Sequence, residues 1–309
     1  MGKLAIVCPG QGSQTPGFFS PWLEIAAFAE SIEASQSASG VDLLKHGTTS
    51  DADTIRDTAI AQPLIVAAGL ASLASLFGGS KVPATVYGVA GHSVGEITAA
   101  VAAGILSPEL GMKFVTERGS QMAKAASLEV TSMAAVLGGD AEAVVAHLIS
   151  LDLEPANYNG GGQIVAAGSA EAIAALQATP PAGARVIPLQ VAGAFHTRFM
   201  KPAVESLDSY ASGLKVADPS PRIWSNSNGK PVASGTDFLN TLVSQVSSPV
   251  RWDLCMQQMV EDGVTAIIEV LPGGTLTGLA KRSMPGVETL ALKTPEHLDA
   301  ARELISNHS

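Results

Sequence analysis

Residues 91–95 read Gly-His-Ser-Val-Gly and separate a β-rich run from the Ala-rich stretch 97–103. A Gly-x-Ser-x-Gly pentapeptide between a strand and a helix is typical of a nucleophile elbow, a sharp turn that presents a serine hydroxyl at the end of a sheet. Chance also produces this pentapeptide in a Gly- and Ser-rich chain, but the flanking strand and helix favour the elbow. The pattern therefore predicts Ser93 as a nucleophile, with the backbone N–H of Val94 at the helix N-terminus available to an oxyanion.

Composition limits the class of protein. The 309 residues are 46% hydrophobic, which suffices for one large domain or for one domain with a smaller inserted one. Its two cysteines are too few for a disulfide framework, and neither has a neighbour at metal-ligand spacing, so we expect no metal site. The net charge of -10 argues against broad nucleic-acid binding.

No part of the sequence is typical of a membrane or secreted protein. The nearest apolar stretch, 61–79, contains Gln62, Pro63 and several serines, so we expect no membrane span. The N-terminal residues contain no long apolar region and no signal cleavage pattern, which predicts a cytoplasmic protein.

The order of predicted elements indicates an α/β fold. A buried strand at 4–8 precedes a Gly- and Pro-rich loop at 9–21, and helices follow at about 22–37 and 61–77. The elbow strand and its helix come next, and then a helix opened by Ser107 with Pro108 at its first position. This alternation predicts a large domain with a mostly parallel sheet.

Between about 130 and 192 the pattern becomes β-α-β-β-α-β, which predicts a ferredoxin-like subdomain inserted into the large domain. The expected division is 1–129 with 193–309 for the large α/β domain and 130–192 for the subdomain. The expected strands are 133–137, 153–158, 163–167 and 185–191, and the expected helices are 141–150 and 171–178.

Residues 91–96 resemble the active-site segment of malonyl-CoA:acyl-carrier-protein transacylases and of the acyltransferase domains of polyketide and fatty-acid synthases. Further segments resemble other motifs of this family in the same order, and together they span nearly the whole chain: Pro9 to Gln14, Glu117 to Gly119 with Met122, Asn157 to Asn159 with Gln163, Gly193 to His196, and Gln245 to Trp252.

The resemblance implies a hydrolase-like fold and a ping-pong acyltransferase. Such an enzyme moves a malonyl group from malonyl-CoA to serine and then to the phosphopantetheine thiol of acyl carrier protein. It implies no bound cofactor, and the absence of appended domains suggests a monomer. Fatty-acid synthesis is the expected pathway, while a polyketide pathway stays open because the chemistry is identical.

The serine needs a base, and the chain has six histidines. His92 is adjacent to Ser93, and neighbouring side chains in a sharp turn point apart. His196 ends an apolar run, where a histidine is more often structural, but the resemblance implies that it is the catalytic base. It also implies that the backbone carbonyl of Gln245 orients the imidazole. No Asp or Glu is singled out for the third position of a hydrolase triad.

The resemblance also assigns the remaining site residues. The backbone N–H of Gln11 would join that of Val94 in the oxyanion hole. Arg118 would bind the malonyl carboxylate through its fork of donors, although an arginine in this context is as often a solvated surface residue. Met122 would line the acyl pocket, and the Phe195 ring would favour malonyl over methylmalonyl groups.

Two departures weaken the match. Gly193 replaces the histidine that begins the family's histidine segment, so malonyl specificity is favoured without being settled. Residues 160–162 are three glycines where relatives often carry a proline, which can loosen that turn.

Parts of the sequence are also compatible with three other functions. A nucleotide-binding loop at Gly10 is weak because Thr15 replaces the third glycine of its pattern. A serine hydrolase could use the same elbow, and a binding or scaffold protein could retain a vestigial site. An acidic carrier protein would need a local basic patch on this acidic chain, and the candidates are Lys113, Lys124, Arg185, Arg198, Lys201, Lys281 and Arg282.

Overall fold

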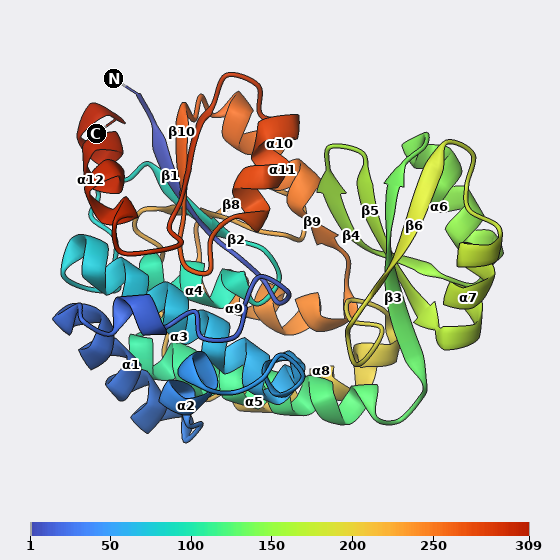
Figure 1. The fold of residues 1–309 in the computed structure, drawn as a ribbon, viewed down its shortest axis with the longest axis horizontal. Helices are drawn as coiled ribbons and strands as arrows, with labels where there is room; N and C mark the ends of the chain where they lie inside the picture. The colour runs from blue at the N-terminus through green and yellow to red at the C-terminus, as the bar shows by residue number, and fades with distance from the viewer. Residues whose placement is uncertain (1, 309) are drawn as a thin grey trace.

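A computed structural model describes residues 2–308 and contains two sheets (Figure 1). The first sheet has the strand order β11-β10-β1-β2-β7-β8. Its neighbouring strands are parallel except for β8, which is antiparallel to β7. The predicted mostly parallel sheet is therefore confirmed. The strands are β1 (Leu4–Cys8), β2 (Gly88–Gly91), β7 (Arg222–Trp224), β8 (Pro231–Val232), β10 (Ala266–Glu269) and β11 (Glu288–Ala291).

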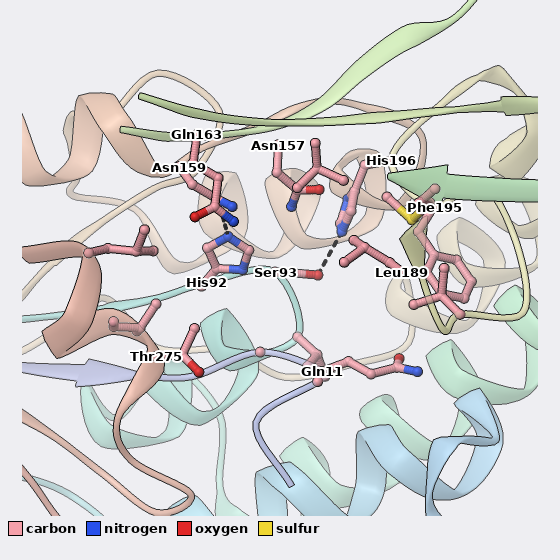
Figure 2. Close-up of a pocket in the computed structure, with 18 of the residues that line it drawn as sticks. Gln11, His92, Ser93, Asn157, Asn159, Gln163, Leu189, Phe195, His196 and Thr275 are labelled. Carbon is pink, nitrogen blue, oxygen red and sulfur yellow. Dashed lines mark hydrogen bonds between the residues drawn. The ribbon is translucent and has the colours of Figure 1, made fainter. Parts of the chain in front are cut away.

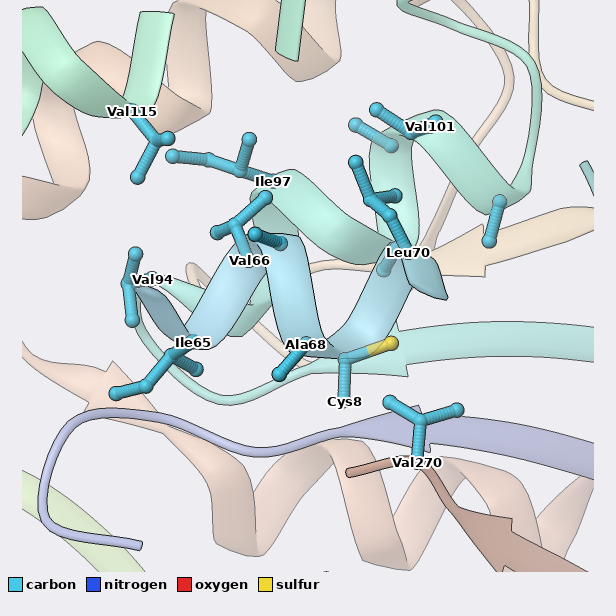
Figure 3. Packing of buried hydrophobic residues seen from close by; sticks show 14 of the residues in the cluster. Cys8, Ile65, Val66, Ala68, Leu70, Val94, Ile97, Val101, Val115 and Val270 are labelled. Atoms are coloured by element: carbon cyan, nitrogen blue, oxygen red, sulfur yellow. The ribbon is translucent and has the colours of Figure 1, made fainter. Parts of the chain in front are cut away.

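One long apolar helix, α3 (Thr58–Phe77), forms the centre of the core beside this sheet (Figure 3). It is long and apolar enough to cross a membrane, but 89% of its most apolar window is buried inside the protein. Side chains from β1, the elbow and the residue after β10 pack around it, including Cys8, Val94 and Val270. The apolar side chains of α3 therefore pack inside the protein core.

The other helices associated with the first sheet follow the expected alternation. The first begins four residues later than predicted, after a short 3-10 helix, η1 (Ser20–Trp22). These helices are α1 (Ala26–Ser39), α2 (Leu43–Thr48), α4 (Gly95–Ala102), α5 (Pro108–Ala126), α8 (Lys201–Ala211), α9 (Gly235–Ser244), α10 (Trp252–Glu261), α11 (Thr275–Ser283) and α12 (His297–His308). The remaining 3-10 turns are η2 (Thr54–Arg56), η3 (Arg198–Met200) and η4 (Gln245–Ser247).

The second sheet has the order β6-β3-β5-β4-β9, and the predicted β-α-β-β-α-β order of its first elements is confirmed. β3, β4, β5 and β6 pair antiparallel, while β9 adds to β4 in parallel. The strand β9 comes from outside the range 130–192, and the division into domains stays a prediction. The elements are β3 (Thr131–Gly138), α6 (Ala141–Ser150), β4 (Glu154–Gly160), β5 (Gln163–Ser169), α7 (Ala170–Ala178), β6 (Ala184–Leu189) and β9 (Val250–Arg251).

The sheet register explains why distant segments meet. Because β1 and β2 are parallel neighbours, Cys8 lies opposite Gly91 and both strands end at one edge. The His92 N–H donates to the Cys8 carbonyl over 2.9 Å and joins the elbow to the start of the loop that contains Gln11. After β6 the chain returns from the second sheet and carries His196 to the same edge; its N–H donates to the Val246 carbonyl over 3.0 Å.

Candidate active site

The turn after β2 is a nucleophile elbow held under backbone strain. Ser93 has φ of 53°, in the left-handed region that a side chain disfavours. A Cβ on Gly91 would lie 2.0 Å from the carbonyl carbon of Gly95, and one on Gly95 would lie 2.2 Å from the Cys8 oxygen. Only glycine fits either position, because strand and helix backbones touch there.

Ser93 and His196 form a hydrogen-bonded pair (Figure 2). The imidazole Nδ1 lies 2.8 Å from the Gln245 carbonyl oxygen, which can only accept, so Nδ1 carries the proton. Nε2 is therefore the free acceptor, and it receives the Ser93 hydroxyl over 2.7 Å. This tautomer is the one that a general base requires.

Burial keeps this imidazole neutral. His196 is only 3% exposed, and burial, followed by the positive charge of Arg118, lowers its pKa from 6.5 to about 3. The hydrogen bond to the Gln245 carbonyl opposes the shift. His196 is thus unprotonated and able to accept a proton across the physiological pH range.

Arg118 projects from α5 into the same site and is 1% exposed. Its Nη1 donates to Gln62 Oε1 over 2.6 Å, and its Nη2 donates to Gln245 Oε1 over 2.8 Å. Nη2 also lies 3.5 Å from the Ser93 hydroxyl oxygen. Within residues 2–308 its Nε is a buried donor without a partner. Burial lowers the pKa of Arg118 to about 10, so the guanidinium stays charged at neutral pH.

Behind the pair lies a buried polar network. The Gln245 Nε2 donates to Glu96 Oε2 over 2.5 Å, and the Asn226 N–H donates to Glu96 Oε1 over 2.6 Å. The Asn226 side chain accepts from the Ser93 N–H over 2.8 Å and donates to the Gly91 carbonyl over 2.7 Å. Burial raises the pKa of Glu96 to about 8, while the Asn226 N–H and the Arg118 charge lower it.

A cavity of about 340 Å³ opens beside Ser93. It is lined by strands of the second sheet, by the loops that follow β1 and β2, and by α3, α5 and α11. Figure 2 shows Gln11 below Ser93 and Phe195 beyond His196. The Gln11 side chain donates to the Arg56 carbonyl over 3.2 Å. The structure brings every predicted site residue to this cavity or its wall; the cavity is lined by Gln11, Ser93, Val94, Arg118, Met122, Phe195 and His196, and Gln245 lies behind them.

Several site residues were missed by the sequence analysis. Gln62 holds Arg118 and also donates to the Met122 sulfur over 3.3 Å, yet its sequence context suggested only an interruption of an apolar stretch. Glu96 directly follows the elbow, and its place in the 91–96 segment is the signal that points to it. Asn226 carried none, because the elbow residues that it binds, Ser93 and Gly91, are more than 100 residues away.

His92 does not contact the Ser93 hydroxyl, as expected. Its Nε2 lies 2.8 Å from Asn159 Oδ1, and burial lowers its pKa. Asn157 and Asn159 of the N-x-N segment line the cavity, so this segment joins the second sheet to the elbow. Among residues 2–308, no cluster of His, Cys, Asp and Glu could hold a metal ion.

Fold and site together define a serine-histidine acyl-transfer site on an α/β scaffold, with a buried arginine beside the nucleophile. The family model described as "Acyl transferase domain" matches residues 5–294. The chain belongs to this family and is an acyltransferase.

Known relatives support this assignment over the full length. The chain is 48% identical to the malonyl CoA-acyl carrier protein transacylase of Mycobacterium bovis, over 97% of this chain and 100% of the relative. It is 48% identical to the crystal structure of MCAT from Mycobacterium tuberculosis, with a TM-score of 0.91 over 97% of this chain and 99% of that one. A malonyl-transacylase solved in complex with a type II PKS acyl-carrier protein is 29% identical, with a TM-score of 0.90 over 98% and 99% of the two chains.

Proposed function

We propose that this enzyme transfers a malonyl group from malonyl-CoA to the phosphopantetheine thiol of acyl carrier protein, supplying extender units for fatty-acid synthesis. The observation that carries the proposal is the 2.7 Å hydrogen bond between Ser93 Oγ and His196 Nε2 beside a buried arginine. The names of the full-length relatives support the same activity.

In the first half-reaction, Ser93 Oγ attacks the thioester carbonyl while His196 Nε2 takes the hydroxyl proton. The tetrahedral oxyanion would accept from the backbone N–H groups of Gln11 and Val94. On collapse the carbon–sulfur bond breaks, His196 returns the proton to sulfur, and coenzyme A leaves. In the second half-reaction, His196 deprotonates the carrier thiol, which attacks the malonyl-serine carbonyl. On collapse the ester carbon–oxygen bond breaks, and His196 returns the proton to Ser93 Oγ.

Arg118 would select the acyl group. A malonyl carboxylate offers two acceptor oxygens to a guanidinium whose Nε has no partner among the described residues. An acetyl group would leave this buried charge without its ligand, which is unfavourable. Met122 and Phe195 line the same cavity, and the Phe195 ring would exclude an α-methyl branch.

The test is intact-mass detection of acyl-enzyme after brief mixing with malonyl-, methylmalonyl- or acetyl-CoA. We expect a malonyl adduct that is absent in Ser93→Ala and slower with the other two thioesters. Arg118→Ala should slow malonylation by about 30- to 1000-fold, because truncating one partner of a buried charge pair costs about 2 to 4 kcal/mol.

An assay of free malonate in the same reactions, beside the intact-mass measurement, separates the alternatives. Free malonate as the main product without carrier protein would favour a serine hydrolase. The absence of any adduct with the wild-type enzyme would favour a binding or scaffold protein with a vestigial site.

Acyl carrier protein is the proposed partner, and the basic group best placed for it is Arg282. Two other candidates are held in ion pairs: Lys113 with Glu109, and Arg198 with acidic residues before and within β4. Arg282 lies on α11 and lines the Ser93 cavity. We further propose a monomer that needs no bound cofactor and acts in the cytoplasm, without binding nucleic acid or a membrane.

A further inference from the structure

The buried carboxylate of Glu96 lies behind the catalytic pair, in the first turn of α4. The side chain is 1% exposed and both of its oxygens accept hydrogen bonds. Oε1 accepts the Asn226 backbone N–H over 2.6 Å, and Oε2 accepts the Gln245 side-chain amide over 2.5 Å. A solvent-facing glutamate in the first turn would stabilise its helix only through its charge interaction with the helix dipole. The side chain of Glu96 instead points into the protein.

Asn226 and Gln245, the two residues that donate to Glu96, contact the elbow, His196 and Arg118. Asn226 binds both sides of the strained elbow, at the Ser93 N–H and the Gly91 carbonyl. The Gln245 carbonyl accepts the His196 Nδ1 proton, which fixes the tautomer of the base.

The side chain of Gln245 serves a third function. Its Oε1 accepts from Arg118 Nη2 over 2.8 Å, while its Nε2 faces Glu96. The amide therefore lies between the positive and the negative buried charge, and the Glu96 carboxylate determines which end of the amide faces Arg118.

We propose that Glu96 is a positioning residue, whose carboxylate aligns Ser93, His196 and Arg118 together through Asn226 and Gln245. The inference rests on the proposed function. A carboxylate is required because it accepts at both oxygens, whereas a glutamine would turn an NH₂ group toward one of the two donors.

A second cavity makes this inference testable by chemical rescue. It has a volume of about 390 Å³, shares no lining residue with the Ser93 cavity, and is lined by Glu96 and Gln245 together with Thr241, Ser244 and Ser248. Truncation of Glu96 would join the vacated space to this polar cavity. A small carboxylate such as formate could then occupy the position of the lost group.

The titratable groups around Glu96 decide the conditions of the assay. Arg118 of α5 and Cys255 of α10 interact with its charge, while Tyr158 of β4 and Arg251 of β9 line the same cavity. Because burial raises the pKa of Glu96 to about 8, protonation below that pH weakens the carboxylate as an acceptor. The assay is therefore run at about pH 8.5, where most of Glu96 is ionised.

The experiment measures the rate of Ser93 malonylation by rapid quench and intact mass. Glu96→Gln should be about 10- to 100-fold slower than wild type, since it loses a charge-assisted hydrogen bond, and should still be folded at the assay temperature. The control Glu117→Gln, beside Arg118 but bonded to Gln121, should stay within about twofold of wild type. Glu96→Ala should be slow and should recover at least about fivefold, saturably, with sodium formate, but not with formamide or sodium chloride.

Each outcome has one meaning. Glu96→Gln malonylated at the wild-type rate overturns the inference, and so does a folded Glu96→Ala that formate does not restore. If Glu96→Ala fails to fold, the malonylation rate of Glu96→Gln, compared with that of Glu117→Gln, is sufficient to test the inference. A wild-type enzyme that forms no malonyl adduct would instead overturn the proposed function.

Discussion

At the scale of single residues, the imidazole of His196 works as a base from a buried position, and burial sets its pKa. Burial and the Arg118 charge lower that pKa from 6.5 to about 3. In the unfolded chain the same group takes up a proton near 6.5. The stability that its neutral form contributes is therefore complete above about pH 6.5 and is lost as the pH falls toward 3.

We predict that His196 stays neutral, with its proton on Nδ1, from pH 8 down to about pH 5. The measurement is ¹⁵N NMR of the imidazole nitrogens across this range, with His196→Asn to assign the signals. A titration midpoint near 6.5 for this residue would show that the imidazole is solvated and would contradict the structure.

Also at the residue scale, local motifs identified the residues that react. The side-chain hydrogen bonds that position these residues join distant parts of the chain and were not predicted. Ser93 and His196 stand in recognisable segments and meet as predicted. Asn226 and Gln245 contact Glu96 from 130 and 149 residues away, and a side-chain hydrogen bond of that kind leaves no periodic pattern in a sequence. The family motif predicted the role of the Gln245 carbonyl at His196. The roles of Glu96, Asn226 and the Gln245 side chain could be inferred only from coordinates.

At the scale of elements, the elbow depends on contact between the backbones of β1, β2 and α4. We predict that Gly95→Ala destabilises the protein by about 2 to 3 kcal/mol, because its Cβ would meet the Cys8 oxygen at 2.2 Å and backbone must shift. The control is Gly278→Ala in the middle of α11, where an added Cβ would meet no atom within 4 Å outside its own helix backbone, so alanine should stabilise by about 0.5 to 1 kcal/mol. Urea denaturation of both variants measures the difference, and equal stabilities would refute the close approach.

The elements themselves were predicted best where turn or capping residues bound them, such as Pro9 and Gly10 after β1 and the Asp140 cap before α6. β1 and α6 have the bounds expected from the sequence. The strand β9 was not predicted. Its two residues are too few to show alternating polar and apolar side chains, and they pair with β4 across about 90 positions of the sequence. Helix α1 begins after Ile25, because a 3-10 turn takes up the preceding residues.

At the scale of the whole molecule, the cavity lies between the second sheet and the loops that end β1 and β2, and the proposed partner, an acidic carrier protein, has to reach it on an acidic chain. Arg282 lies on α11, and its side chain packs against Gly161 in the β4–β5 turn. It therefore joins α11 to the second sheet at the edge of the Ser93 cavity. A net charge of -10 repels an acidic carrier at long range, whereas an exposed guanidinium at the cavity attracts it locally.

We predict that Arg282→Ala raises KM for carrier protein by about 2- to 5-fold, because an exposed rim charge contributes about 0.5 to 1 kcal/mol. The maximal rate should stay unchanged, since Arg282 touches none of the catalytic hydrogen bonds. The increase should shrink as salt rises from about 0.05 to 0.5 M, because screening weakens the wild-type attraction. Lys113→Ala, whose amine pairs with Glu109 on the same helix, is the matched control and should leave KM unchanged. Steady-state transfer to carrier protein at two salt concentrations measures both variants, and an equal effect of the two substitutions would place the docking surface elsewhere.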